Sequence, residues 1–379
     1  MVWPVKHRAA TIPHQNPRGA SLKNLTHIAE QFTPQGDITA VKEFGNGNIN
    51  DTYIVTRNTA DKFVLQRINT HVFTKPHLIM QNMRAFTEHV HRRVQAEGHA
   101  WDAPHVIAAR DGNDFFIDDE GGFWRAISFI RDSQSFDTIT DLDHAREVGH
   151  ALGTFQNLIS DLPIESLADT LEGFHITPRY LAQYDRVFSQ NGTHTSPEVK
   201  HGLRFVEERR AFAHTLEHAG LPLRPIHGDP KVNNVMIHSE TGKAISIVDL
   251  DTVKPGLVHY DIGDCLRSGC NPLGEDAPDW EAVHFNPEIG SAILEGYLTQ
   301  AQAFLTAADY AHIFNSIRLI AFELGLRFFT DHLAGDVYFK VKYPGHNLHR
   351  ALVQFKLTES IEAHEGEIRN IIEKMVVAK

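Results

Sequence analysis

Hydrophobic and polar residues follow the pattern of β-strands in the first third of the chain. Five segments there are rich in β-branched and aromatic residues: 38–41, 52–55, 62–68, 115–117 and 123–130. Such runs, separated by turns at 45–48 and 118–122, are typical of antiparallel strands and hairpins. We therefore predict a three-stranded meander followed by a further hairpin.

Helical periodicity dominates the rest of the chain. Apolar positions between Leu78 and Glu97 recur with helical spacing, and a short amphipathic helix is expected at 22–31. From about Ser133 the pattern is mostly helical, interrupted by a compact β-like region at 226–253. A sheet with one helix, followed by a mostly helical half, predicts an α+β protein with two lobes. The predicted units are a flexible tail at 1–21, an N-terminal lobe at 22–131 and a C-terminal lobe at 132–379.

Composition narrows the classes of function. A net charge of −12 argues against a nucleic-acid-binding protein, which needs a basic surface. The charge would suit a cationic substrate, but an acidic surface also serves solubility alone. Cys265 and Cys270 are too few for a disulfide framework, so we expect buried thiols in a reducing, cytoplasmic compartment. No apolar run approaches the roughly 20 residues that span a bilayer, and we expect no membrane partner.

The segment 226–237 carries the most specific chemical signal. Phosphoryl transfer needs a carboxylate to orient and deprotonate the attacking hydroxyl, and oxygen ligands that hold Mg²⁺ against the nucleotide phosphates. Asp229, Asn234 five residues later and Asp249 at the end of a hydrophobic run supply these groups in the order that kinases use. We predict Asp229 as the catalytic base and Asn234 and Asp249 as the Mg²⁺ ligands.

Other roles are possible for these polar residues and their neighbours. Asp229 precedes a proline, where a turn or capping carboxylate is common, although Asn234 and Asp249 at matching offsets favour the catalytic role. Lys231 is either a catalytic cation for the transferred phosphate or a solvated loop lysine. Asp251 is interpreted as structural, with a second metal contact as the alternative.

These motifs resemble a known superfamily. His-Gly-Asp-x-x-x-x-Asn with Val-Asp-Leu-Asp is similar to the aminoglycoside phosphotransferases and choline kinases, and the chain resembles bacterial N-acetylhexosamine 1-kinases most. The segments that carry this resemblance are 45–53, 63–69, 325–331, 335–339 and 342–347. The resemblance implies a protein-kinase-like bilobal fold, ATP and Mg²⁺ as cofactors, a nucleotide-binding N-terminal lobe, and a larger C-terminal lobe for catalysis and substrate. It also implies that Asp261 braces the catalytic loop.

The nucleotide is expected to contact the N-terminal lobe at three places. Gly45 and Gly47 lie where a kinase covers the phosphates with backbone N–H groups, although Asn-Gly is also a common hairpin turn. Gln66 stands where protein kinases carry a lysine, and could donate a neutral hydrogen bond; Glu88 is a possible partner on the following helix. Adenine is expected to meet backbone groups between Ser128 and Arg131, including Ile130.

The resemblance also indicates the acceptor. It places Asn48, Arg327 and Tyr338 in a hexosamine pocket beside Asp229, with core packing as the alternative for Tyr338. We therefore expect transfer of the γ-phosphate to the anomeric hydroxyl of an N-acetylhexosamine by a monomer or weak homodimer. The alternatives are an amine-alcohol, choline or aminoglycoside kinase, and an inactive nucleotide-binding regulator, which intact Asp229, Asn234 and Asp249 oppose.

Overall fold

The computed structural model describes residues 22–32, 37–44, 49–58, 61–98, 100–191 and 196–377. The predicted tail at 1–21 and the predicted glycine turn at 45–48 lie outside these ranges. Within them, every helix is too short or too polar to cross a bilayer.

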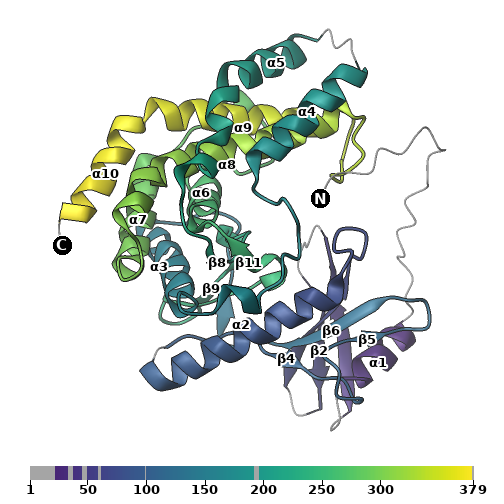
Figure 1. Ribbon diagram of the computed structural model, residues 1–379. Coiled ribbons are helices and arrows are strands. Elements are labelled where there is room, and N and C mark those ends of the chain that lie inside the picture. Colours follow the sequence, from purple (N-terminus) through teal and green to yellow (C-terminus); the bar gives the residue numbers. More distant parts are fainter. Residues whose placement is uncertain are drawn as a thin grey trace.

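An antiparallel sheet forms the N-terminal part of the protein (Figure 1). Its strands are β1 (Ile38–Glu43), β2 (Asp51–Arg57), β3 (Lys62–Ile68), β4 (Val106–Ile107), β5 (Phe116–Ile117) and β6 (Phe123–Ser128). The order is β1-β2-β3-β6-β4, with β5 paired to β6. The predicted meander and hairpin are confirmed, and the short β4 adds an edge strand that the sequence did not reveal.

The two faces of this sheet pack against different helices, because side chains alternate along each strand. Val55, Leu65 and Trp124 pack with α1 (Leu22–Glu30) in a small core. Ile68 and Ile127 on the opposite face join the main core of the protein, which includes the apolar side of α2. Gln66 and Arg125 share the parity of Ile68 and Ile127, so they face α2 and the C-terminal part.

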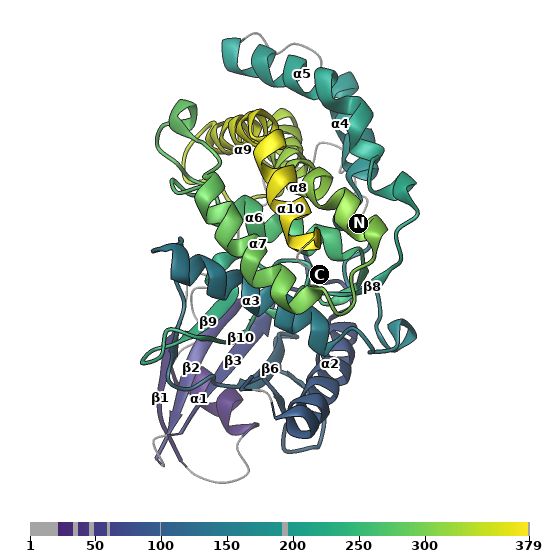
Figure 2. The same cartoon turned by 90° about the vertical axis from the view of Figure 1, so that its left-hand side faces the viewer.

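Helix α2 (Pro76–Glu97) lies between the sheet and the helical part in Figure 1 and beside the sheet in Figure 2. Its first residue is a proline, which the first helical turn tolerates because that N–H has no helical partner. It ends at Gly98, whose φ of 72° is the left-handed conformation that closes many helices. Ile79, Met83 and Phe86 bury its apolar face.

The C-terminal part is mostly helical. Its helices are α3 (Leu142–Leu158), α4 (Thr177–Asn191), α5 (Pro197–Arg209), α6 (Val258–Gly269), α7 (Pro287–Ala301), α8 (Ala307–Leu333), α9 (His346–Ala363) and α10 (Glu365–Val377). Its short strands are β7 (Ser133–Gln134), β8 (Arg224–Ile226), β9 (Val235–His238), β10 (Ala244–Ile247) and β11 (Lys254–Gly256). The predicted α+β, kinase-like arrangement is confirmed, while the boundary near 131 stays a prediction.

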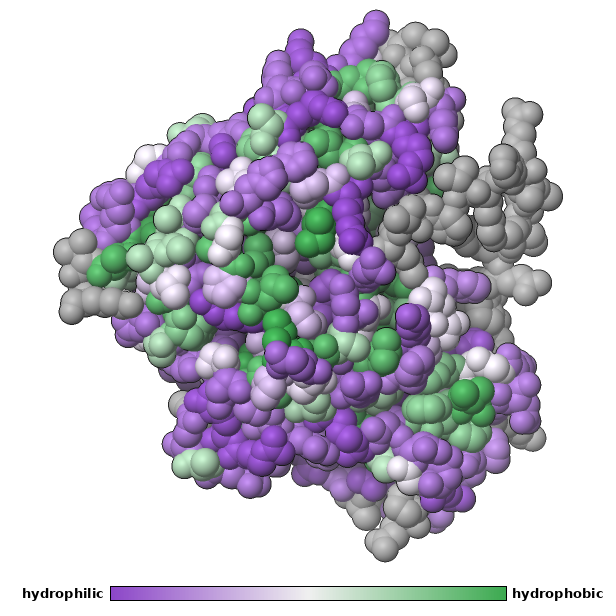
Figure 3. All heavy atoms as spheres, in the orientation of Figure 1, coloured by the Kyte–Doolittle hydropathy of each residue, from purple (hydrophilic) through white to green (hydrophobic). Residues whose placement is uncertain are grey.

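Short strand pairs set the position of the loops that carry the motifs. β8 pairs with β11, and β9 pairs with β10 and β7, all antiparallel. The segment 227–234, named the catalytic loop after its predicted base, therefore leaves β8 and enters β9. The segment 248–253, named the metal loop after the ligand predicted in it, connects β10 to β11. Hydrophilic residues cover much of the outer face in Figure 3, with smaller hydrophobic areas between them.

Candidate active site

A buried carboxylate on α6 holds the backbone of the catalytic loop in place. Asp261 on α6 accepts hydrogen bonds from the backbone N–H groups of His227 (2.9 Å) and Gly228 (2.8 Å). Gly228 has φ 89°, and a Cβ on it would lie 2.7 Å from the Thr252 carbonyl oxygen, so glycine is required at this close approach. The predicted bracing role of Asp261 is confirmed by these contacts.

Asp229 and Lys231 form an ion pair, with 2.9 Å between Lys231 Nζ and Asp229 Oδ2. Burial raises the pKa of Asp229, although the neighbouring ammonium opposes this shift. The carboxylate in turn raises the pKa of Lys231, which keeps its positive charge. Lys231 is therefore held beside the predicted base rather than extended into solvent.

Asn234 and Asp249 bring amide and carboxylate oxygens to the same region. The Asn234 side-chain amide donates to the Asp229 carbonyl oxygen (2.7 Å), and the Val248 N–H donates to the Asn234 carbonyl oxygen (2.9 Å). Asp249 has φ 65°, and its side chain is exposed, without a hydrogen bond or ion pair to any residue that the structure describes. Oxygen donors of these two types suit Mg²⁺, so the residues present fit the predicted metal.

Asp251 is a buried carboxylate with protein partners. It is 3% exposed, its Oδ1 lies 2.5 Å from Arg125 Nη1, and its Oδ2 accepts a hydrogen bond from Asn50 Nδ2 at 2.6 Å. Protein groups therefore contact both oxygens, as the structural interpretation of Asp251 expected.

Gln66 is engaged inside the sheet. Its amide oxygen accepts from Arg125 Nε and Nη2 at 2.9 and 2.7 Å, and its amide nitrogen donates to the Thr52 hydroxyl at 3.0 Å. Glu88 pairs with Arg84 on the exposed side of α2, and no described contact links it to Gln66. The nucleotide-binding role of Gln66 stays a prediction, and the cation beside it is Arg125.

The structure describes only some of the other groups predicted to bind the nucleotide or the sugar. The residues Gly45, Gly47 and Asn48 lie outside the described ranges. The Ser128 N–H donates to the His105 carbonyl oxygen (2.9 Å), and the Ile130 carbonyl oxygen accepts from the Ser133 hydroxyl (2.9 Å). Protein partners thus occupy part of this segment, and its contact with adenine stays a prediction.

Arg327 and Tyr338 line one cavity in the C-terminal part. The cavity is small, about 30 Å³, which is well below the range of about 300–1,000 Å³ typical of small-molecule sites. The other lining residues are Leu171, Glu172, Phe174, Tyr180, Gln183 and Thr330. The Arg327 guanidinium lies 5.2 Å from the ring centre of Phe174 and 5.0 Å from that of Tyr180, at distances that allow cation–π attraction.

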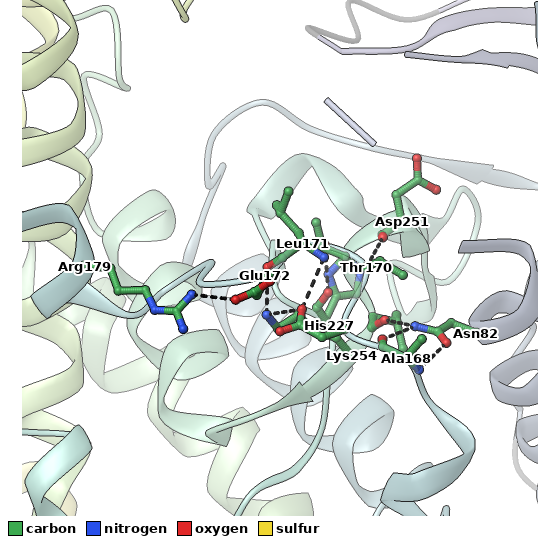
Figure 4. Close-up of polar contacts among 12 residues, drawn as sticks. Asn82, Ala168, Thr170, Leu171, Glu172, Arg179, His227, Asp251 and Lys254 are labelled. Carbon is green, nitrogen blue, oxygen red and sulfur yellow. Dashed lines mark hydrogen bonds and ion pairs between the residues drawn. The ribbon is translucent and has the colours of Figure 1, made fainter. Parts of the chain in front are cut away.

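One wall of the cavity belongs to a strap, residues 163–176, that crosses from α3 to α4 (Figure 4). Asn82 of α2 donates to the carbonyl oxygens of Ala168 (2.8 Å) and Val253 (2.9 Å). The Lys254 ammonium donates to Asp169 (2.6 Å) and to the Leu171 carbonyl oxygen (2.9 Å). These contacts fasten the cavity wall to the strand that follows the metal loop.

A buried histidine connects the strap to the catalytic loop. His175 places one ring nitrogen 2.7 Å from the Gly228 carbonyl oxygen and the other 3.0 Å from a carboxylate oxygen of Glu323 on α8. Burial opposes a charge on the imidazole, but the Glu323 carboxylate outweighs it and the pKa of His175 is raised. Glu323 lies one helical turn before Arg327 on the same face of α8, so the His175–Glu323 pair ties α8 to Gly228, the residue before Asp229.

Tyr338 is positioned by a second buried carboxylate. Asp331 Oδ1 accepts from the backbone N–H groups of Val337 and Tyr338, both at 2.9 Å. Its Oδ2 accepts from the Phe339 N–H and the Asn347 side chain, also at 2.9 Å. Four donors thus converge on one fully buried side chain.

Replacing Asp331 with asparagine should loosen this loop, because an amide N–H₂ would face donors that now meet an acceptor. We expect a loss of about 1–3 kcal/mol in the free energy of unfolding, measured by urea denaturation, and a higher KM for the acceptor but not for ATP. Asp336→Asn is the matched control, since its side-chain oxygen can still accept from Asn347. Equal KM values in the two variants would show that the loop does not shape the acceptor site.

Sequence reasoning missed several residues of this region. Phe174, Tyr180 and Gln183 are separated from Arg327 along the chain and meet it only through packing of the strap and α4 on α8. His175 and Glu323 are 148 residues apart. The sequence did contain a signal for Arg125, because a charged residue inside the apolar strand 123–130 requires a buried partner.

The chain was compared with known proteins. A family model described as the phosphotransferase enzyme family (APH) matches residues 40–305. A microcompartment-associated aminopropanol kinase shares 15% identity at a TM-score of 0.63, over 92% of this chain and 98% of that one. Choline kinase from Cryptosporidium parvum shares 15% identity at a TM-score of 0.53, over 88% of this chain and 91% of that one. An amicoumacin kinase in complex with AMP-PNP and Ca²⁺ shares 14% identity at a TM-score of 0.55, over 93% of each chain.

At these identities the solved structures establish the fold, while the family match spans most of the chain, including the catalytic and metal loops. The predicted superfamily is confirmed, and the narrower resemblance to N-acetylhexosamine 1-kinases stays a prediction. The stretch that carries Asp229, Asn234 and Asp249 lies inside the matched residues, and the chain belongs to the phosphotransferase enzyme family.

Proposed function

We propose that this protein is an ATP- and Mg²⁺-dependent sugar kinase that phosphorylates the anomeric hydroxyl of an N-acetylhexosamine. One observation carries the choice of acceptor. The Arg327 guanidinium lines the cavity and has no hydrogen bond or ion pair to a carboxylate among the residues that the structure describes. A neutral, hydroxyl-rich acceptor can use its N–H donors, whereas a cationic acceptor would meet a like charge.

The aromatic residues around the cavity suit the same acceptor. Phe174, Tyr180 and Tyr338 offer apolar surface for the carbon face of a sugar ring, and Gln183 and Glu172 offer polar groups for its hydroxyls. Glu172 also pairs with Arg179 at 3.2 Å, which offsets its charge. Aromatic walls combined with convergent polar groups would fix the orientation of the acceptor. Correct orientation supplies much of the acceleration in phosphoryl transfer.

In the proposed mechanism Asp229 accepts the proton of the attacking hydroxyl. The anomeric hydroxyl is more acidic than an ordinary alcohol, so a carboxylate of modest basicity suffices. The acceptor would displace Lys231 from Asp229 and free its ammonium for the transferred phosphoryl group. Asn234 and Asp249 would hold Mg²⁺, which neutralises phosphate charge when bound.

A kinase for cationic amino alcohols or aminoglycosides is the second candidate. The net charge of −12 and the presence of Glu172 at the cavity favour it. Solved structures with the same fold include aminopropanol and choline kinases. The absence of a carboxylate partner for Arg327 among the residues that the structure describes opposes it, because a cation-binding pocket should not present a guanidinium whose charge no carboxylate offsets.

The test is ATP consumption with Mg²⁺ across N-acetylhexosamines, hexoses, choline, aminopropanol and kanamycin, with the product identified by phosphorus NMR. We expect turnover with an N-acetylhexosamine and a phosphate on its anomeric carbon. Turnover confined to the cationic alcohols would overturn the proposal, and ATP binding without turnover of any acceptor would favour a regulator.

Arg327→Met should raise KM for the sugar by about 10- to 100-fold, because a charge-assisted hydrogen bond is lost. KM for ATP should stay unchanged in the same steady-state assay. Arg186→Met, which removes an exposed arginine from α4, is the control. If Arg327→Met instead improved turnover of choline with no loss for sugars, the guanidinium would not select the acceptor.

A further inference from the structure

Arg125 is a buried cation with an unusual position. It is 1% exposed, and its neighbours Trp124 and Ala126 on β6 belong to the small core below the sheet. A buried charge is stable only when it is paired and hydrogen-bonded. Its Nε and Nη2 donate hydrogen bonds to the Gln66 amide oxygen, and its Nη1 forms an ion pair with Asp251.

The sheet orients this guanidinium. Gln66 lies directly opposite Arg125 in the β3–β6 register, and Thr52 lies opposite Gln66 in the β2–β3 register. The Thr52 hydroxyl accepts from the Gln66 amide nitrogen at 3.0 Å, which turns the amide oxygen toward Arg125. Three neighbouring strands therefore aim one cation toward the C-terminal part.

The other end of the ion pair lies in the metal loop. Asp251 is two residues after Asp249, inside the single turn 250–252, and it is 3% exposed. Its second oxygen is held by Asn50, and Asn50 itself accepts from the Asn69 N–H at 2.9 Å. In Figure 4 the Asp251 side chain points away from the strap, while its carbonyl oxygen accepts from Thr170 at 3.2 Å.

We propose that Arg125 and Asp251 are a positioning pair, whose ion pair fastens the metal loop to the sheet and so fixes Asp249 for Mg·ATP. Protein kinases order their nucleotide site with an ion pair between a strand lysine and a glutamate of the following helix. The family resemblance places Gln66 at the position of that lysine, and the side chain by which α2 contacts the end of the metal loop is the neutral Asn82, which donates to the Val253 carbonyl oxygen. The cation comes from the adjacent strand and the anion from the metal loop itself.

This inference rests on the proposed use of Mg·ATP but is independent of the acceptor. A purely structural ion pair could be replaced by apolar residues of similar volume without loss of function. A positioning pair could not, because Asp249 would lose its fixed place. Groups that orient metal ligands typically contribute about 10- to 100-fold to metal affinity.

The experiment is calorimetric titration of the full chain with AMP-PNP at several Mg²⁺ concentrations. Arg125→Met combined with Asp251→Leu removes both charges at similar volume. We expect this variant to fold, with a Kd for Mg·AMP-PNP raised by about 10- to 100-fold. A matched control is Arg209→Met with Glu362→Gln, which removes a half-buried pair between α5 and α9 and should bind as the wild type does.

Single conservative variants provide a second measurement. Arg125→Lys keeps the charge but cannot bridge Gln66 and Asp251 together, and Asp251→Glu displaces the carboxylate. Each should raise the Mg²⁺ concentration needed for half-maximal nucleotide binding, and each is the deciding variant if the double one fails to fold. A folded double variant, or both conservative variants, with wild-type Mg²⁺ dependence would overturn the proposal. Failure of the sugar proposal would leave this binding result unchanged.

Discussion

Asp229→Asn is expected to lower kcat for phosphoryl transfer by about 10²- to 10⁴-fold, the usual contribution of a positioned general base. The amide cannot accept the proton of the attacking hydroxyl, but it has nearly the same size as the carboxylate. Lys231 loses its 2.9 Å ion pair in this variant, and its ammonium becomes free for the nucleotide phosphates. We therefore expect KM for ATP to be unchanged or slightly lower, as measured by steady-state kinetics with the preferred sugar.

The control for this prediction is Glu240→Gln, which neutralises an exposed carboxylate between β9 and β10, outside the catalytic and metal loops. Its kcat should equal that of the wild type. Thermal denaturation of both variants separates a chemical defect from an unfolding defect. Wild-type turnover by a folded Asp229→Asn protein would remove Asp229 from the role of base.

The catalytic loop could be predicted from the sequence because its determinants are local, whereas its brace, Asp261, lies 34 residues from His227 and was expected only from the family resemblance. Gly228 must adopt a positive φ, Asp229 follows it directly, and Asn234 reaches back over five residues to the Asp229 carbonyl oxygen. Strand and helix patterns were equally local, so the meander, α2 and the helical half were confirmed.

What the sequence did not reveal depends on contacts between distant elements. The contacts of the Gln66 amide with Arg125 and Thr52 could not be predicted, because they depend on the strand register that places these three side chains in one row; its contact with the nucleotide stays a prediction. Lys231 could not be assigned until its contact with Asp229 was known. The cavity around Arg327 required the packing of α4 and the strap on α8, which no pattern within one segment encodes.

Asp249→Asn is the second substitution with a large expected effect, and it tests the metal rather than the base. Asp249 has φ 65°, a left-handed conformation that asparagine adopts readily but most residues avoid. The backbone of the metal loop should therefore persist while one negative charge toward Mg²⁺ is lost. We expect kcat to fall by about 10²- to 10³-fold, and the Mg²⁺ concentration for half-maximal activity to rise.

Two comparisons make this result specific to the metal. Asp336→Asn introduces the same change at another aspartate of positive φ, 58°, outside the catalytic and metal loops, and should leave the Mg²⁺ dependence unaltered. Asp229→Asn should lower kcat without moving the Mg²⁺ midpoint, whereas Asp249→Asn should move both. If the Asp249 variant bound Mg·AMP-PNP as tightly as the wild type in calorimetry, the ligand assignment would fail. The different roles proposed for the two loops follow from their geometry. Asp229 is paired with a lysine, whereas Asp249 alone presents an exposed, unpaired carboxylate among the described residues of the two loops.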